Sequence, residues 1–481
     1  MDEFDRMPSA GSARPEPPGP WKKPMGRICW GLALITITLN FLGLDIVLPA
    51  LGAALLCLGL RPLRRENGAF RFAYACAVLY AILRLTHVLF QATPLVHWLE
   101  GLIGGEWNTA AGPVPLYTVL RAVLTQLVLA FGVGGLWQGL KRVFIQAGQK
   151  PRTAAAGGLV ILETLLIPMA LIGLKGWLLA GPVLILGVFL IVRLRGLGKR
   201  LDQAGYALNP ATPGVSGGLA LGLWLVLHLL IIAVLPLPFS RLPAGIQTPA
   251  PAADSNSAIR GQMLELGFPE DILGQLDDGE LARFEGAYGL KKEGYRMDSR
   301  HPDGMPEIIT VEVPVRDERY GFRAVYLAYL YWSPMEASGG YMEGVRVDQD
   351  FQGVTVRTTI PDGVLKWRNS AGTQFTMPLA FRLESDGGPC CYADFSLPED
   401  VSGPMEGFLF WEAAPSLPET VSIYNFSVTA AHRRSFWQYP YTLPSEILAS
   451  GFYPPSWQWR MFRWTSEGQL APEGLYDPQK Y

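Results

Sequence analysis

Four polar side chains lie near the middle of long apolar stretches in the first half of the chain. They are Arg84, Gln126, Glu163 and His228. Polar groups at that depth in a bilayer are costly and usually face a bundle interior or an aqueous cavity. We expect Arg84 to pair with Glu163, with Gln126 and His228 hydrogen-bonded nearby, because pairing removes two uncompensated charges.

This intramembrane polar cluster has two interpretations. In the first it is a structural clasp that fixes the register of the helices. In the second it is a proton or solute site, in which His228 titrates near neutral pH. His87 lies one turn from Arg84 on the same helical face and fits either interpretation.

A second candidate site is the adjacent pair Cys390 and Cys391. Neighbouring Cα atoms are about 3.8 Å apart across a trans peptide, which is below the usual range for a disulfide. A redox-sensitive bridge between the two would therefore be strained. In a strand the side chains would point to opposite faces, and two unlinked thiols are the alternative.

The last stretch of the chain, from Phe436, is rich in aromatic residues. A carbohydrate-binding platform is one interpretation, because ring faces stack on sugars. A packed core or an interfacial belt is the other. The candidate platform residues are Trp437, Tyr439, Trp457, Trp459 and Trp464.

Other chemistry has little support in the sequence. Asp348 and Asp350 have the same-face spacing of a weak calcium site, but surface charge on a strand explains them more simply. We predict no metal site, no cofactor and no catalytic residue, since P-loop, H-E-x-x-H and C-x-x-C motifs are absent. A net charge of −2 gives no electrostatic basis for binding nucleic acid.

The composition indicates which elements must position these residues. Apolar residues make up 49% of the 481 residues and charged residues only 17%, whereas about 25% is charged in typical soluble domains. The apolar excess lies in the first half. There we predict a disordered cytoplasmic tail over residues 1–21 and a seven-helix membrane domain over residues 22–239. The predicted spans cover residues 28–42, 44–60, 72–91, 116–137, 156–174, 177–192 and 215–236, with a short interfacial helix near 95–103.

Residues 28–60 are too long for one span and short for two. A single helix would place Asp45 deep in lipid, at a cost of roughly 2.5–3.5 kcal/mol. A hairpin instead puts the polar and helix-breaking residues at a turn. With seven spans and a cytoplasmic N-terminus, the basic clusters at 22–27, 61–71, 141–152 and 193–200 all face the cytoplasm of a plasma membrane. The second half of the chain then lies outside.

The second half has ordinary globular composition. Residues 240–254 read as a Pro/Ala linker, residues 255–290 as a small helical subdomain and residues 291–481 as a β-rich domain. Short apolar runs separated by Gly, Pro, Asp and Ser turns predict a mainly antiparallel β-sandwich or jelly-roll. The expected fold class is a membrane α-helical bundle followed by an extracytoplasmic α+β domain. The predicted strands cover residues 308–316, 323–332, 344–351, 353–360, 374–385, 390–397, 407–413 and 420–431.

Residues 43–65, GLDIVLPALGAALLCLGLRPLRR, resemble a pattern in functionally uncharacterised multi-pass membrane proteins of Gram-positive bacteria. The resemblance rests on Gly43, Asp45, Leu48, Pro49, Gly52, Gly59 and Leu60. Ala50 departs from the pattern, in which Leu-Pro-Asp is usual. The resemblance implies a bacterial plasma membrane and the hairpin topology, and it implies no catalytic residue.

The leading functional prediction is a non-enzymatic membrane protein. Its outer β-rich domain would bind or sense a ligand or partner protein of the cell envelope, and its other partner would be the lipid bilayer. A transporter that uses the intramembrane polar cluster is the alternative. An envelope enzyme is a third class, with the least support because no catalytic motif is present.

Overall fold

The chain folds into two compact units, Met1–Leu235 and Pro236–Tyr481. This computed structural model describes residues 19–36, 44–109, 112–172, 177–209, 216–242, 245, 247–249, 257–295, 307–333, 342–350, 356–383, 390–398, 401–415, 422–433, 435–450, 459–473 and 475–476. Residues 1–18 of the predicted tail, the turn of the predicted hairpin, residues 250–254 of the predicted linker and Trp457 lie outside the described residues.

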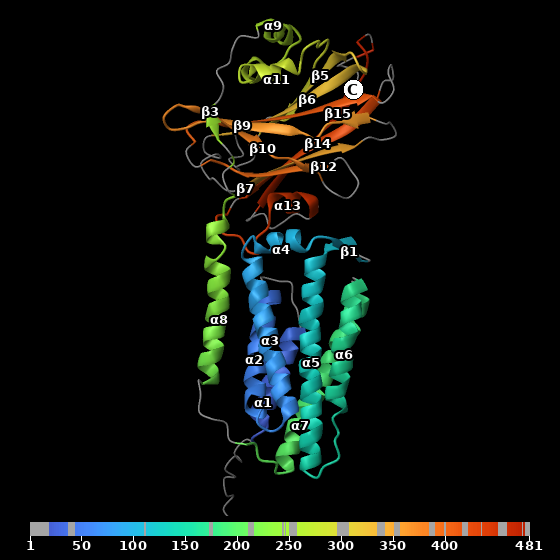
Figure 1. Cartoon of the computed structure of the whole chain (residues 1–481), viewed down its shortest axis with the longest axis vertical. Helices are drawn as coiled ribbons and strands as arrows, with labels where there is room; N and C mark the ends of the chain where they lie inside the picture. Colours follow the sequence, from blue (N-terminus) through green and yellow to red (C-terminus); the bar gives the residue numbers. More distant parts are fainter. Residues whose placement is uncertain are drawn as a thin grey trace, which may run out of the picture. The chain divides into compact units, whose positions relative to one another are not determined.

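The first unit is a bundle of long helices (Figure 1). A short helix, α4 (Leu95–Ile103), and a small hairpin of β1 (Glu106–Thr109) and β2 (Gly112–Pro115) precede α5. Leu95–Ile103 is the segment in which the sequence predicts an interfacial helix. The long helices are α1 (Lys22–Thr36), α2 (Leu44–Leu63), α3 (Gly68–Gln91), α5 (Leu116–Gln146), α6 (Ala154–Ile172), α7 (Trp177–Gln203) and α8 (Gly217–Val234).

Five helices in the described part of the chain are long and apolar enough to cross a membrane. Within the described residues, two of the seven predicted spans do not reach that length. The apolar stretch in α6 is Ala154–Met169, and α1 has 15 residues and begins with two lysines. The qualifying stretches are Ile46–Leu63, Gly68–Gln91, Leu116–Gln146, Gly181–Gln203 and Gly217–Phe239.

Residues 28–60 form parts of two helices that pack closely against each other. A Cβ atom on Gly31 would lie 2.8 Å from the carbonyl oxygen of Gly52, and one on Gly52 would lie 2.7 Å from the carbonyl oxygen of Gly31. Near the other end of the pair, a Cβ on Gly59 would lie 2.9 Å from the carbonyl oxygen of Pro24. Only glycine permits this approach of the two backbones. Gly52 and Gly59, two positions of the quoted pattern, are therefore contact points between α1 and α2.

Trp21 fixes the start of α1 to the end of α7. Its ring is fully buried. Its backbone N–H donates to Asp202 Oδ1 at 2.9 Å, and its indole N–H donates to the carbonyl oxygen of Tyr206 at 3.0 Å. The predicted tail over residues 1–21 is therefore too long at its end, because a buried and doubly hydrogen-bonded tryptophan belongs to the bundle.

The second unit contains two antiparallel sheets (Figure 1). The larger sheet has the strand order β3 (Thr248–Pro249), β10 (Gln374–Leu379), β9 (Asp362–Arg368), β13 (Met405–Pro415), β6 (Gly321–Trp332), β5 (Glu307–Asp317) and β4 (Lys291–Tyr295), and β8 (Val356–Thr358) also pairs with β13. The smaller sheet has the order β11 (Arg382–Leu383), β12 (Cys390–Ser396), β7 (Met342–Asp350), β14 (Ser422–Arg433) and β15 (Trp459–Leu470).

Strand β6 is apolar from Ala324 to Trp332, and both of its faces are covered there. Tyr326, Ala328, Leu330 and Trp332 lie in a core shared with Val345 of the smaller sheet. Val325, Leu327 and Tyr329, the alternate residues, lie in a second core that includes helical residues. Side chains alternate between faces along a strand, so one continuous apolar run supplies two cores.

Helices cover the outer faces of both sheets. α9 (Ser257–Glu265), α10 (Glu270–Leu273) and α11 (Asp278–Ala282) share a core with the larger sheet. A capping box between Asp277 and Glu280 starts α11. α13 (Pro444–Ser450) packs on the smaller sheet through Leu448, in a core with Tyr392 and Trp459. The layers of this unit are therefore helices, sheet, sheet and helix.

The sequence predicts the β-rich, antiparallel character of the second unit correctly but misses several strands. β9 was missed because Lys366 interrupts its apolar pattern. In the structure Lys366 is buried, and its Nζ donates to Glu280 Oε2 at 2.5 Å and to the carbonyl oxygen of Gln275 at 2.8 Å. Burial of a paired lysine depends on a partner far away in the chain, so the local pattern does not indicate it.

Candidate functional site

The structure brings two of the four intramembrane polar residues into direct contact. Gln126 on α5 donates from Nε2 to the carboxylate Oε2 of Glu163 on α6 at 2.5 Å. The same nitrogen lies 3.2 Å from the backbone oxygen of Glu163. Glu163 is only 4% exposed. The amide therefore supplies a hydrogen bond to a carboxyl group that water scarcely reaches, and it links α5 to α6.

Arg84 lies on α3, one turn after the buried Tyr80. Both Arg84 and Glu163 act electrostatically on Tyr80, so this tyrosine is a common neighbour of the arginine and the carboxyl group. Arg84 also acts electrostatically on His228. The structure therefore joins Gln126 to Glu163, and the pairing of Arg84 with Glu163 and the place of Arg84 and His228 in one cluster stay predictions.

His228 belongs to the contact that joins α8 to the bundle. Its Nδ1 lies 2.9 Å from the carbonyl oxygen of Trp224, and the two ring centroids are 4.6 Å apart. The indole N–H of Trp224 donates to the carbonyl oxygen of Ala50 on α2 at 2.9 Å. His228 and Ile231 are the buried residues of α8. The Nε2 atom of His228 is buried without a hydrogen-bond partner among the described residues.

In the second unit, a cavity of about 420 Å³ lies beside β9 and β10. Its aromatic part is formed by Trp367 and Phe375, which face each other across the two strands with ring centroids 5.9 Å apart and planes inclined by 21°. Its polar part includes Arg241, Gln247 and Asn369. Ligand sites commonly combine apolar walls with a few polar groups that orient the ligand. We call this space the sheet-edge cavity.

The segment that follows α8 forms one wall of the sheet-edge cavity. Thr248 pairs with Thr376 of β10, and their hydroxyl oxygens are 3.0 Å apart. The backbone N–H of Leu242 donates to Ser396 Oγ at 2.8 Å. In its described residues, the predicted linker over residues 240–254 therefore contacts the β-rich domain at Leu242 and at the two-residue edge strand Thr248–Pro249.

Cys390 and Cys391 are both free thiols on opposite faces of β12. Cys390 donates to Asp348 Oδ1 at 2.7 Å, and Cys391 is 2% exposed. Burial raises the pKa of both thiols to about 11, and the carboxylate of Asp348 adds to this rise. The structure therefore agrees with the second interpretation, in which the two thiols are unlinked. Successive side chains of a strand point to opposite faces.

Asp348 has protein partners for both of its carboxylate oxygens. Arg346 Nε donates to Oδ1 at 2.5 Å, and the hydroxyl of Ser427 donates to Oδ2 at 3.0 Å. Together with the thiol of Cys390, these contacts hold the Asp348 carboxylate among protein donors. The side chain of Asp350 lies outside the described residues.

The five candidate platform residues do not all present their rings to solvent. Trp459 is 2% exposed and Tyr439 is 9% exposed. Trp464 packs against the core between the sheets, and its indole N–H lies 3.3 Å from Thr310 Oγ1. Trp437 is half-buried. Burial of Trp459 and Tyr439 favours the packing interpretation for these two residues.

Sequence reasoning missed the sheet-edge cavity because its walls come from separate segments. One signal was present. Trp367 and Phe375 flank the turn N-S-A-G-T, in which Asn369 Oδ1 accepts from the backbone N–H of Thr373 at 2.9 Å and Gly372 has a φ of 80°. Turn residues between two aromatics predict a hairpin with a cross-strand aromatic pair.

No protein-family model matches this sequence, and no curated protein matches it either. The resemblance carried by residues 43–65 therefore stays a prediction.

Proposed function

We propose that this chain is a multi-pass plasma-membrane protein whose C-terminal domain binds or senses a ligand of the cell envelope. One observation carries the proposal. The sheet-edge cavity is built partly from Arg241, Leu242 and Gln247, which follow the last apolar stretch, Gly217–Phe239, directly in the chain. A ligand in this cavity would touch the segment through which the domain is joined to the membrane.

The proposed topology has seven spans, with α1 and α6 crossing the membrane beside the five longer helices. It is supported by the close packing of α1 on α2 and by the positions of the basic residues. Clusters of Lys and Arg follow α2, α5 and α7 or lie at their ends, as expected for cytoplasmic ends. The N-terminus is then cytoplasmic and the β-rich domain extracytoplasmic. The lipid bilayer is then one binding partner of the protein. The resemblance of residues 43–65 implies that this bilayer is the plasma membrane of a Gram-positive bacterium.

The chemistry of the sheet-edge cavity suggests the class of ligand. The stacked rings of Trp367 and Phe375 offer an apolar wall. The guanidinium of Arg241 and the amides of Gln247 and Asn369 offer hydrogen bonds. A cell-wall fragment with sugar faces and hydroxyl or anionic groups satisfies both. No covalent step is required, so the proposal is one of binding and not of catalysis.

The weak attachment of α8 gives binding a route into the bundle. Along α8 the buried residues are His228 and Ile231, while Leu223, Leu229 and Leu230 are more than half exposed. Few packed contacts mean a small cost for displacing this helix. Binding at the cavity would act on Arg241, Leu242 and Gln247, which residues 235–240 connect to the end of α8.

Reporter fusions test the topology. We expect a cytoplasmic reporter to be active after Arg200 and an extracytoplasmic reporter to be active after Pro236. A cytoplasmic signal from the second fusion would place the β-rich domain inside the cell and end the envelope proposal.

A titration tests the ligand. Full-length protein in lipid nanodiscs is titrated with soluble peptidoglycan fragments and with a glycerol-phosphate polymer. We expect saturable binding of one of them, weakened about tenfold or more by Phe375→Ala, since losing a buried aromatic contact commonly costs over about 1 kcal/mol. Leu383→Ala, at a side chain that is 56% exposed in the same domain, is the matched control. Equal binding by both variants would exclude this cavity.

Transport is a second candidate, favoured by the Gln126–Glu163 hydrogen bond and by the buried Nε2 of His228. The single variant Gln126→Leu leaves Glu163 without its amide donor and should lower stability by about 1–3 kcal/mol. The double variant Gln126→Leu, Glu163→Leu removes the buried carboxyl group and should recover most of that loss. Recovery with intact ligand response identifies a clasp. Recovery with loss of solute uptake in proteoliposomes identifies transport.

A further inference from the structure

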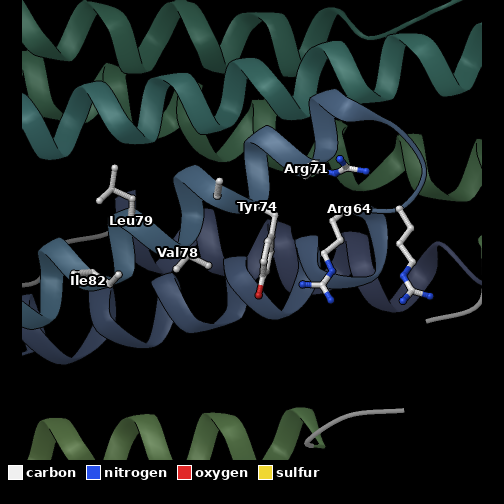
Figure 2. Close-up of a pocket in the computed structure, with 8 residues that line it drawn as sticks. Arg64, Arg71, Tyr74, Val78, Leu79 and Ile82 are labelled. Carbon is white, nitrogen blue, oxygen red and sulfur yellow. The ribbon is translucent and has the colours of Figure 1, made fainter. Parts of the chain in front are cut away.

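A groove of about 580 Å³ runs from the end of α2 along one face of α3. Its polar end is formed by Arg64, Arg65 and Arg71. Its wall continues through Tyr74, Val78 and Ile82, which recur every four residues on one helical face. Figure 2 shows Arg64 beside the ring of Tyr74, with Val78 and Ile82 farther along the helix. We call it the arginine groove.

We propose that the arginine groove binds one phospholipid with an anionic headgroup, its phosphate between Arg64 and Arg71 and one acyl chain along α3. This proposal rests on the membrane topology proposed above, in which residues 61–71 face the cytoplasm. It names a lipid site that is separate from the sheet-edge cavity.

Charge complementarity identifies the polar end. The groove lining holds three arginines and no acidic residue. The nearest acid in the chain, Glu66, is directed elsewhere. Its carboxylate accepts from the backbone N–H of Asn209 at 2.6 Å and from the hydroxyl of Tyr206 at 3.4 Å. Guanidinium groups bind phosphate oxygens through paired N–H donors, so an anionic phosphodiester fits this end.

Length identifies the apolar end. Arg71 and Ile82 are eleven residues apart on α3, which at the helical rise is about 16 Å. One leaflet of the hydrocarbon core is about 15 Å thick. Leu79 and Ile82 are 46% and 52% exposed, so the wall is open to an acyl chain. A free phosphate would use only the arginines and leave this wall empty.

Tyr74 lies where the two parts of the groove meet. The guanidinium of Arg64 lies over its ring, 5.2 Å from the centroid. This contact holds the charge beside α3 and directs it along the groove. Tyrosines are also enriched at the boundary between headgroups and acyl chains, which is the depth that the proposed lipid pose gives to Tyr74.

Native mass spectrometry of the full-length protein in detergent tests the site. The probes are dioleoyl phosphatidylglycerol, dioleoyl phosphatidylcholine and glycerophosphoglycerol, which is the headgroup without chains. Wild-type protein should bind phosphatidylglycerol in preference to the other two. Arg64→Gln with Arg71→Gln should weaken phosphatidylglycerol binding about 30-fold, since each of the two basic residues near an anionic surface contributes about 1 kcal/mol. Phosphatidylcholine binding should not change.

The matched control is Lys150→Gln with Arg152→Gln, which removes two exposed positive charges after α5. It should bind phosphatidylglycerol as the wild type does. An equal loss in both double variants, or a loss in neither, would overturn the proposal. Tight binding of glycerophosphoglycerol would also overturn it, because the groove would then be a site for a free phosphodiester.

The melting temperature of the arginine double variant shows whether it folds. If it does not fold, a second double variant tests the proposal. Leu79→Ser with Ile82→Ser changes exposed residues only and should weaken phosphatidylglycerol binding while leaving glycerophosphoglycerol unaffected. Unchanged lipid binding in this variant would contradict the pose. Binding in detergent does not depend on which side of a membrane residues 61–71 face, so this result and the reporter fusions fail independently.

Discussion

Arg433 donates from Nη1 to the backbone carbonyl oxygen of Ser240 at 3.1 Å. Arg433 is 1% exposed, and it also donates to the carbonyl oxygens of Ser435 at 2.7 Å and Phe436 at 3.1 Å. Ser240 comes six residues after the end of α8. One buried guanidinium therefore holds the start of the C-terminal domain against the segment that follows β14.

Replacing Arg433 should destabilise the attachment of the segment around Ser240 to the C-terminal domain. Arg433→Met leaves the carbonyl oxygens of Ser240, Ser435 and Phe436 without this donor, and we expect a loss of about 2–3 kcal/mol in the free energy of unfolding. Thermal unfolding of the full-length protein in detergent measures it. Arg319→Met, at an exposed turn residue, should change little. A melting temperature for Arg433→Met equal to that of the control would show that the clamp adds nothing.

Replacing a glycine by alanine tests the close packing of α1 against α2. Gly52→Ala places a methyl group 2.7 Å from the carbonyl oxygen of Gly31, and overpacking of this kind costs about 1–3 kcal/mol. Gly26→Ala is the control, because a Cβ there meets no atom within 4 Å. Melting temperatures should fall for Gly52→Ala alone. Equal values for the two variants would mean that the helices separate freely.

The reactivity of Cys390 should depend on Asp348. With pKa values of about 11 for both thiols of the pair, alkylation by iodoacetamide should be slow at neutral pH. It should accelerate about tenfold for each unit of pH below the pKa. Asp348→Asn removes the carboxylate that favours the protonated thiol, so it should speed alkylation of Cys390. Peptide mass mapping measures the alkylation rate at each site, and the melting temperature of the variant checks that it folds. An unchanged rate at Cys390 would show that burial alone sets its pKa.

Glu406 should give the C-terminal domain a stability that increases toward acid. Burial raises the pKa of Glu406 above its ordinary value of 4.5, although the hydroxyl of Tyr329 donates to it at 3.0 Å. The folded state then binds this proton more tightly than the unfolded state. Its contribution to stability therefore grows as the pH falls through the folded pKa and levels off below 4.5.

Glu406→Gln removes that dependence. We expect the variant to be more stable than the wild type near neutral pH, with an advantage that shrinks as the pH approaches 4.5. Chemical denaturation at a series of pH values measures the difference. Glu318→Gln, at an exposed turn residue, is the control. The same pH dependence for both variants would assign the effect to other groups.

The sequence by itself determined the features that depend on neighbouring residues. The length and apolarity of Gly217–Val234 predict α8, and the run in Gly321–Trp332 predicts a buried strand. Both are local properties, because a helix satisfies its own backbone and a strand alternates its side chains whatever lies beside it. The polar positions of Gln126 and Glu163 were also visible, since a polar residue in an apolar run is conspicuous without a structure.

Tertiary structure alone decided which residues meet. Gln126 bonds Glu163 across 37 positions in the chain, and Lys366 bonds Glu280 across 86. The sheet-edge cavity and the hold of Arg433 on Ser240 likewise join segments that are distant in sequence. Such contacts depend on how helices and sheets pack. A local sequence pattern predicts whether a segment is a helix or a strand and which of its faces is buried. It does not predict which other segment packs against that face.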